Sequence, residues 1–279
     1  MANVTVTTAA NFIPEIWSND ILRVVEANLI IGPRVHNYSA DVKEYGDTIH
    51  VPSVDEITAT AKTAGTDMTF TANTEGVVNI AIDQHYYAAV KIEDIAKIQS
   101  KANLMSEYTT AIGYAVAKKM DATLAALAAG FSQTTGTTNT AITDAVILSS
   151  IVYLDDANAP FTNRHFVIKP AAKKDILSLD KFVLFQNTGA VNGSSRVLNG
   201  QLGEVYGVEI GVTTNITQSA SPVTNQNMMF HKDALGLATQ ESVRVQSQYK
   251  LESLATIVAA DAIWGVKEMR DTFGVLVKS

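Results

Sequence analysis

The sequence contains no cysteine, which excludes disulfides, thiol nucleophiles and zinc–thiolate sites. Charged residues are also scarce. They make up 18% of the 279 residues, against about 25% in an average soluble domain. A surface poor in charge is less costly to bury against other subunits, but an Ala- and Thr-rich fold of any kind has the same composition. Composition alone therefore allows association without requiring it.

A basic stripe of the kind that binds nucleic acid is missing. The formal net charge is −7 and the isoelectric point is about 5.2. The densest basic spots are Lys118-Lys119 and Lys173-Lys174, and both have acidic neighbours. We therefore expect no tight binding to phosphates. A container that encloses nucleic acid without gripping it remains compatible with this charge.

Long apolar runs are missing too. No segment approaches the ~20 apolar residues of a membrane span. Residues 1–13 lack the basic start and apolar core of a signal peptide. We expect a protein that is made and folded in a cytoplasm and has no membrane partner.

Sequence patterns typical of catalysis or metal binding are missing as well. The histidines have no ligand-like spacing, and the glycines at 200, 203 and 207 lack the Lys-Ser/Thr of a phosphate loop. The acidic pairs Glu93-Asp94 and Asp155-Asp156 fit helix ends, and there is no serine nucleophile elbow. The sequence thus predicts no catalytic, cofactor or metal site. A soluble hydrolase is the alternative from another class of function. It would need a convergent polar pocket, and the sequence indicates none.

The first 90 residues predict an arm and a hairpin. Residues 1–14 read as a loose arm, and a short amphipathic helix containing Trp17 follows and ends near Gly32-Pro33. Strands are expected over 47–57 and 76–90, with a Thr- and Ala-rich tip at 58–75. Because a two-stranded hairpin is marginal alone, we expect it to lie on a second subunit. Met68 and Phe70 are the expected contacts at its tip.

Residues 91–129 predict one long helix. Apolar residues recur every three or four positions from Ile95 to Leu127, and a helix of that length would span about 57 Å. We expect its apolar stripe, which includes Ile112, to pack on strands around 241–265.

The remaining sequence predicts a linker at 131–143 and then a compact α/β unit. This unit has helices at 143–156 and 170–179, strands at 165–170 and 204–212, and a Gly- and Asn-rich loop at 186–203. From 226 onward strand patterns dominate, and they are expected to return to the long helix and cover it.

This order of parts resembles the Hong Kong 97-type capsid fold of tailed bacteriophages. Local sequence is similar as well. The matching segments are PEIWSNDI at 14–21, YGDTIHVPSV at 45–54, IDQHYYAAVKIEDIAKIQS at 82–100, VIKP at 167–170, GQLGEVYGVEIGVTTNI at 200–216, FHKDALGLATQESVRVQ at 230–246 and AIWGVKEMRDTFGVLV at 262–277. The resemblance covers nearly the whole chain, and it rests on the ordered set because no one segment is diagnostic.

The resemblance implies an α+β major capsid protein that forms an icosahedral shell around double-stranded DNA. Its expected parts are an arm (1–45), an extended hairpin (46–90), a peripheral domain with the spine helix (91–135 and 225–279) and an axial α/β domain (136–224). Trp17, Lys62, Met68 and Phe70 are the expected inter-subunit contacts. Some relatives cross-link a hairpin lysine to a neighbour's asparagine, which draws attention to Lys62, but that chemistry needs a buried carboxylate that only assembly provides.

The implied partners are further copies of the chain, in hexamers and pentamers, with scaffolding, portal and decoration proteins as further candidates. The implied location is the virion, after assembly in the host cytoplasm. Two alternatives stay open within structural proteins: an encapsulin-like nanocompartment shell, and another phage structural protein such as a tail-tube subunit, against which the long helix argues.

Overall fold

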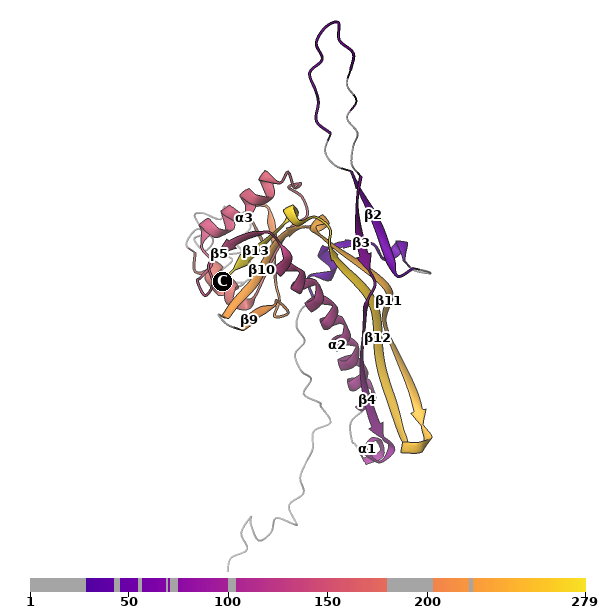
Figure 1. Cartoon of the computed structure of the whole chain (residues 1–279). Helices are drawn as coiled ribbons and strands as arrows, with labels where there is room; N and C mark the ends of the chain where they lie inside the picture. Colours follow the sequence, from indigo (N-terminus) through magenta and orange to yellow (C-terminus); the bar gives the residue numbers. More distant parts are fainter. Residues whose placement is uncertain are drawn as a thin grey trace, which may run out of the picture.

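A computed structural model describes residues 29–42, 46–54, 57–68, 70, 75–99, 104–179, 203–220 and 223–279. These residues form an elongated body built on two sheets, with a thin hairpin projecting from it (Figure 1). The predicted arm, the helix that contains Trp17, and the loop at 186–202 lie outside the described residues.

The first sheet has four strands, in the order β1 (His36–Asn37), β11 (Leu235–Lys250), β12 (Ala255–Glu268) and β4 (Gln84–Glu93). Helix α2 (Leu104–Ala126) lies along one face of it (Figure 1). Ile112 and Val116 are buried in this contact, and Trp264 Nε1 on β12 donates to Thr123 Oγ1 on α2 at 3.2 Å. The predicted packing of the apolar stripe on the C-terminal strands is therefore confirmed for α2.

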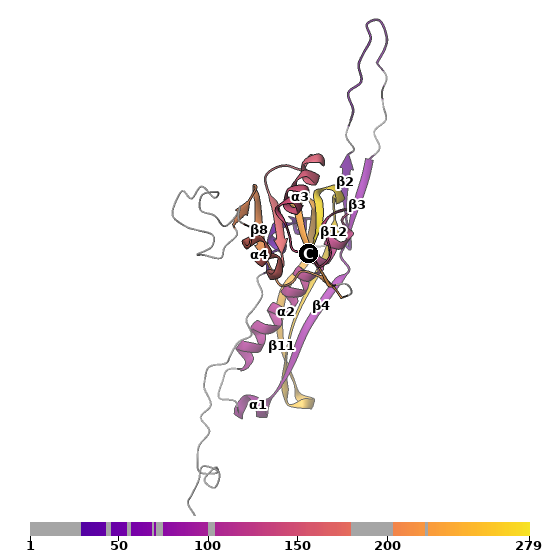
Figure 2. The ribbon, with the colours of Figure 1, turned by 90° about the vertical axis from the view of Figure 1, so that its left-hand side faces the viewer.

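The predicted single helix over 91–129 is wrong at its start. Residues 91–93 end strand β4, because they pair with 255–257 of β12. Helix α1 (Asp94–Gln99) follows, and α2 begins at Leu104. The two helices run in different directions (Figures 1 and 2), and a short η4 turn (Leu127–Gly130) closes α2. The apolar spacing of three and four residues continues through both helices, so it did not indicate the change of direction between them.

The second sheet has seven strands. Its main path runs β5 (Gln133–Gly136), β13 (Gly274–Lys278), β10 (Val223–His231), β6 (Arg164–Ile168), β8 (Val208–Val212) and β7 (Glu204–Val205), and β9 (Gln218–Ala220) pairs with β10. Helices α3 (Asp144–Asp156) and α4 (Pro170–Leu177) belong to the same unit. The helices predicted at 143–156 and 170–179 and the strand predicted at 165–170 are thus confirmed to within two residues at each end.

Two details of this unit differ from the sequence prediction. The strand expected over 204–212 is a tight hairpin, since Tyr206 and Gly207 both adopt positive φ (52° and 78°) and connect β7 to β8. The expected linker at 131–143 contains β5, which pairs in parallel with β13.

The C-terminal strands are shared between the two sheets. β10 and β13 pair with each other in the seven-stranded sheet, whereas the sequence analysis grouped all of 225–279 with the spine helix. The chain crosses to the four-stranded sheet through η5 (Lys232–Ala234) and returns through η7 (Asp271–Phe273). A buried strand carries no periodicity that identifies its sheet, so the strand patterns from 226 onward did not separate these strands.

The projecting hairpin consists of β2 (Thr48–Val54) and β3 (Glu75–Ala81), paired from Thr48–Ala81 to Val54–Glu75. The strand predicted over 76–90 is therefore two strands: after Ile82-Asp83 the chain becomes β4 and pairs with β12. Inward positions at 76, 78, 80 and 82 continue in phase at 84, 86, 88 and 90. Because the alternation is unbroken, the sequence did not indicate that the partner strand changes from β2 to β12.

Candidate assembly surfaces

The base of the hairpin packs on its own subunit. Val42, Ile80 and Ala238 form a small buried cluster, against which Ile49, Val51 and Met269 also pack. A side chain at position 265 of β12 is excluded, because a Cβ on Gly265 would lie 2.2 Å from the Ala81 carbonyl oxygen. The base of the hairpin therefore has a core within its own subunit.

The far part of the hairpin is different. Residues 57–68 and 70 have no regular secondary structure and are all exposed, and they extend well away from the body in both views (Figures 1 and 2). Lys62 is exposed, Met68 is 65% exposed and Phe70 is 92% exposed. Two large apolar side chains are therefore presented to solvent on the limb that leads from the turn at 64–66 back to β3.

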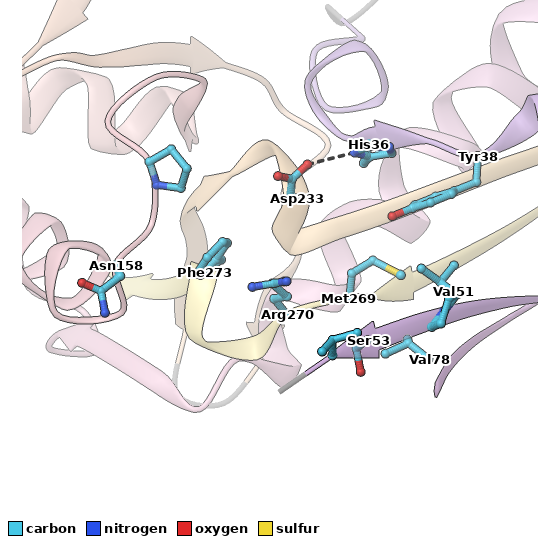
Figure 3. A pocket seen from close by; sticks show the side chains of 13 residues that line it. His36, Tyr38, Val51, Ser53, Val78, Asn158, Asp233, Met269, Arg270 and Phe273 are labelled. Carbon is cyan, nitrogen blue, oxygen red and sulfur yellow. Dashed lines mark hydrogen bonds and ion pairs between the residues drawn. The ribbon is translucent and has the colours of Figure 1, made fainter. Parts of the chain in front are cut away.

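A cavity of about 560 Å³ lies between the hairpin base and the loops of the seven-stranded sheet (Figure 3). On its wall His36 Nδ1 lies 2.8 Å from Asp233 Oδ1, and burial raises the pKa of the neighbouring Tyr38. Ser53 also lines the cavity, but its hydroxyl points away from His36 (Figure 3). The cavity therefore does not assemble a serine nucleophile with a histidine base.

A buried junction joins three parts of the chain. The carboxylate of Asp121 on α2 accepts hydrogen bonds from the backbone N–H groups of Ile31 (2.9 Å) and Gly32 (3.3 Å), and from Asn215 Nδ2 (3.1 Å). Asp121 is 3% exposed and Asn215 is 8% exposed. Residues 31 and 32, within the expected arm region of 1–45, are thus fixed to the spine helix and to the loop after β8.

A second polar contact lies beside this junction. Arg34 donates to Glu209 on β8, and His165 Nδ1 on β6 lies 3.1 Å from Glu209 Oε2. The bond from Arg34 holds the pKa of Glu209 below its usual value, while burial lowers the pKa of His165. The contact anchors the segment before β1 to the seven-stranded sheet.

The end of the body that carries α1 has an unexpected surface. Ile95 and Ile98 were predicted to belong to the packed stripe of the spine helix, but they are 67% and 82% exposed. Leu251 and Leu254 are also exposed. They lie in the turn between β11 and β12, which contacts the start of α1 because the Asp94 N–H donates to the Leu254 carbonyl oxygen. No sequence signal marked this surface, because helical spacing alone does not say which face meets a sheet.

Two further kinds of site, a metal site and a membrane-spanning helix, are absent from the described residues. Their His, Asp and Glu side chains form no cluster of three that would hold a metal ion. Their helices include none long and apolar enough to cross a bilayer. Lys62, Met68 and Phe70 lie in the hairpin, as predicted, and Trp17 lies outside the described residues.

A family model described as phage capsid protein matches residues 77–277, which is more than half of the chain. Solved structures share the fold. A chain of Mycobacterium phage Che8 has 24% identity and a TM-score of 0.82, with 96% of this chain and 97% of that chain covered. The capsid of cyanophage P-SCSP1u has 17% identity and a TM-score of 0.76, with 99% and 96% covered. The mature capsid of bacteriophage PhiM1 has 15% identity and a TM-score of 0.74, with 95% and 91% covered. No curated protein matches.

The two sheets, the spine helix and the projecting hairpin define a shell-forming α+β capsid fold, which confirms the predicted class. The chain belongs to the phage capsid protein family. Its function is that of a major capsid shell protein of the virion, and none of these matches favours the nanocompartment alternative.

Proposed function

We propose that the chain assembles into an icosahedral shell of pentamers and hexamers around phage double-stranded DNA, and that the hairpin is its principal assembly element. The observation that carries this proposal is the exposure of Met68 (65%) and Phe70 (92%) on the part of the projection that lies beyond strands β2 and β3. Large apolar side chains placed this far from their own core gain stability only when another surface covers them.

The contact is head-to-tail. A hairpin that projects from one side of a subunit reaches a different surface on its neighbour, so each subunit gives one hairpin and receives one. Such a heterologous contact generates a ring when the rotation closes. Lys62 on the hairpin contributes polar contacts at the rim of this interface. Trp17, which lies outside the described residues, stays a proposed inter-subunit contact.

The sheets suggest domain limits that differ from those read from the sequence. We assign the hairpin to 46–83, the peripheral domain to 84–130 and 235–268, and the axial domain to 131–231 and 269–279, with the arm at 1–45. The crossings at η5 and η7 mark the boundaries, because the chain changes sheet there.

The shell encloses DNA without reading its sequence. A chain with net charge −7 repels phosphates on average, so packaged DNA is confined and not bound tightly. The subunit is not an enzyme and needs no cofactor. It is assembled in the host cytoplasm, with scaffolding, portal and decoration proteins as its candidate partners.

The decisive experiment replaces residues 60–72 with a short Gly-Ser turn. We expect the subunit to fold with an unchanged far-UV spectrum and thermal transition, because the described hairpin base keeps its packing. Electron microscopy should show that rings and shells are lost. Normal, stable shells would overturn the proposal, and a subunit that fails to fold would place the tip in the subunit core.

Two full-length variants separate hairpin length from apolar contact. Met68→Ser with Phe70→Ser keeps the length and removes the apolar side chains, and it should weaken shells nearly as much as the shortened hairpin does. Thr63→Ser, in the same exposed loop, is the matched control and should assemble normally.

A further inference from the structure

We propose that the Met68 thioether is an oxidation site that controls assembly. A peroxide oxidises this sulfur to the sulfoxide in the free subunit, and a subunit oxidised there no longer joins a ring. The inference rests on the proposed hairpin contact and adds a chemical regulation to it. It concerns one side chain on the limb that leads from the turn at 64–66 back to β3.

Met68 differs from the other described methionines in its exposure. It is 65% exposed, whereas Met228 and Met229 on β10 are completely buried. The remaining described methionines are half-buried and pack against apolar clusters of the body: Met105, Met120 and Met269. Because a peroxide oxidises the sulfur that solvent reaches, Met68 reacts before these five.

The described chain offers few other groups for a peroxide to oxidise. The sequence has no cysteine, whose thiolate is the other sulfur group that peroxides oxidise. Residues 58–67, which precede Met68, are threonine, alanine, lysine, glycine and aspartate only. Trp264 is completely buried. A mild peroxide treatment therefore modifies the hairpin and leaves the described core unchanged.

The hairpin turn holds Met68 away from the body. The Thr66 N–H and the Thr66 hydroxyl both donate to the Thr63 carbonyl oxygen, at 3.3 Å and 2.9 Å. Gly65 between them has φ 86°. Met68 follows this turn on a projection that extends well beyond both sheets (Figures 1 and 2). It belongs to neither apolar cluster of the subunit, so its oxidation leaves the subunit fold intact.

The reaction changes the polarity of this side chain. A sulfur lone pair attacks hydrogen peroxide, the O–O bond breaks, one oxygen stays on sulfur and the other leaves as water. Sulfur loses two electrons and the peroxide gains them. The apolar thioether thereby becomes a polar, chiral sulfoxide. Covering a sulfoxide oxygen without a hydrogen-bond donor is unfavourable, so the oxidised hairpin loses the apolar contact.

The head-to-tail geometry amplifies this loss. Each subunit of a ring gives one hairpin and receives one, so the same penalty recurs at every contact. In an assembled ring the neighbouring subunit covers Met68 and shields its sulfur from peroxide. Oxidation therefore removes free subunits from assembly and leaves completed shells unaffected.

The first test measures the oxidation itself. Free subunits and assembled particles are treated with hydrogen peroxide, and peptide mass spectrometry follows each methionine. Met68 of the free subunit should oxidise about tenfold faster than Met228, and assembly should slow its oxidation about tenfold. Equal rates for Met68 in free and assembled subunits would show that no neighbour covers it and would overturn the inference.

The second test measures assembly after oxidation. Wild-type subunits that are oxidised first should keep their thermal transition and form few rings in electron microscopy. Met68→Leu keeps an apolar side chain of similar volume without the sulfur, so it should assemble equally well with and without peroxide. Met105→Leu, on α2, is the matched control and should stay as sensitive as the wild type.

Met269 is the main rival site, because it lines the cavity at the hairpin base (Figure 3). If Met269→Leu removed the sensitivity to peroxide and Met68→Leu did not, the inference would be wrong. Methionine sulfoxide reductases of both stereospecificities, with a dithiol, return the sulfoxide to the thioether and give a disulfide and water. This treatment should restore ring formation by oxidised wild-type subunits.

The outcomes separate this inference from the hairpin proposal. Oxidised wild-type subunits that assemble normally would overturn the oxidation site, whereas the variant with Met68→Ser and Phe70→Ser still decides the hairpin contact. If Met68→Leu failed to fold, the reductase treatment of the wild type would decide alone. Rings that do not return after reduction of Met68 would then reject the inference.

Discussion

Asn215 donates from its side-chain amide to the carboxylate of Asp121 at 3.1 Å, in a buried contact that spans 94 positions of the sequence. The same carboxylate accepts from the backbone of Ile31 and Gly32. Asp121 belongs to the spine helix and Asn215 to the loop after β8, so the bond ties the helix to the seven-stranded sheet. The contact adds a buried polar link to the apolar core that the two sheets share.

Asp121→Asn should therefore destabilise the subunit. The amide cannot accept all three hydrogen bonds, and losing bonds to a buried charged group costs about 1.5–3 kcal/mol each. We expect the free energy of unfolding, measured by denaturant titration of the unassembled subunit, to fall by at least 1.5 kcal/mol on this scale, roughly one such bond. Asp156→Asn, on the exposed end of α3, is the control and should change it by less than about 0.5 kcal/mol. If both variants changed the free energy of unfolding by the same amount, the hydrogen bonds of Asp121 would contribute no more to stability than an exposed carboxylate does.

Ile112→Asp should remove soluble subunit almost completely. Ile112 is 4% exposed between α2 and the four-stranded sheet, and an unpaired charge buried there costs about 3–5 kcal/mol. Yield in the soluble fraction and thermal melting are the measurements. Ala111→Asp puts the same charge on the exposed side of the same helix and should be tolerated, so comparable losses in the two variants would contradict the packing.

Acid should weaken the subunit through His165 and His231. Burial lowers the pKa of both side chains below the ordinary value of 6.5, so the unfolded chain binds protons at a higher pH than the folded chain does. Stability is therefore fully present above pH 6.5 and is lost as the pH falls through the lowered pKa values. The loss cannot exceed about 1.4 kcal/mol per pH unit for each histidine.

Thermal melting at pH 7.5, 6.5 and 5.5 measures this loss. His165→Gln should reduce the slope below pH 6.5, whereas His50→Gln, on the exposed hairpin, should leave it unchanged. An identical slope in the wild type and the His165 variant would show that His165 is not one of the groups responsible.

Much of the secondary structure could be predicted because local patterns specify it. The alternation of Val78, Ile80 and Ile82 identified an inward face, and the stripe through Ile112 identified the helix that covers the sheet. Neither pattern contains the identity of the partner. An unbroken alternation from 76 to 90 therefore read as one strand, although β3 pairs with β2 and β4 pairs with β12.

The candidate surfaces were predictable only in part, for a related reason. Met68 and Phe70 stood out because the surrounding sequence offers no core for them. Ile95 and Ile98 did not stand out, since they continue the periodicity of a helix whose later turns are buried. Asp121 gave no signal either, because one acid in a helix reads as a surface residue until its three donors, from distant positions, are known.

The pairing of Glu93 with Ala255 has a consequence for how the protein is made. The chain between these residues must leave the ribosome before β4 gains its partner strand, and α2 gains the sheet that covers its apolar face only at that point. Long-range pairing of this kind is slow, and the apolar face of α2 stays without its cover from β12 until residue 255 has been synthesised. A translation product that stops before β12 cannot complete the four-stranded sheet, so it leaves that face of the spine helix exposed.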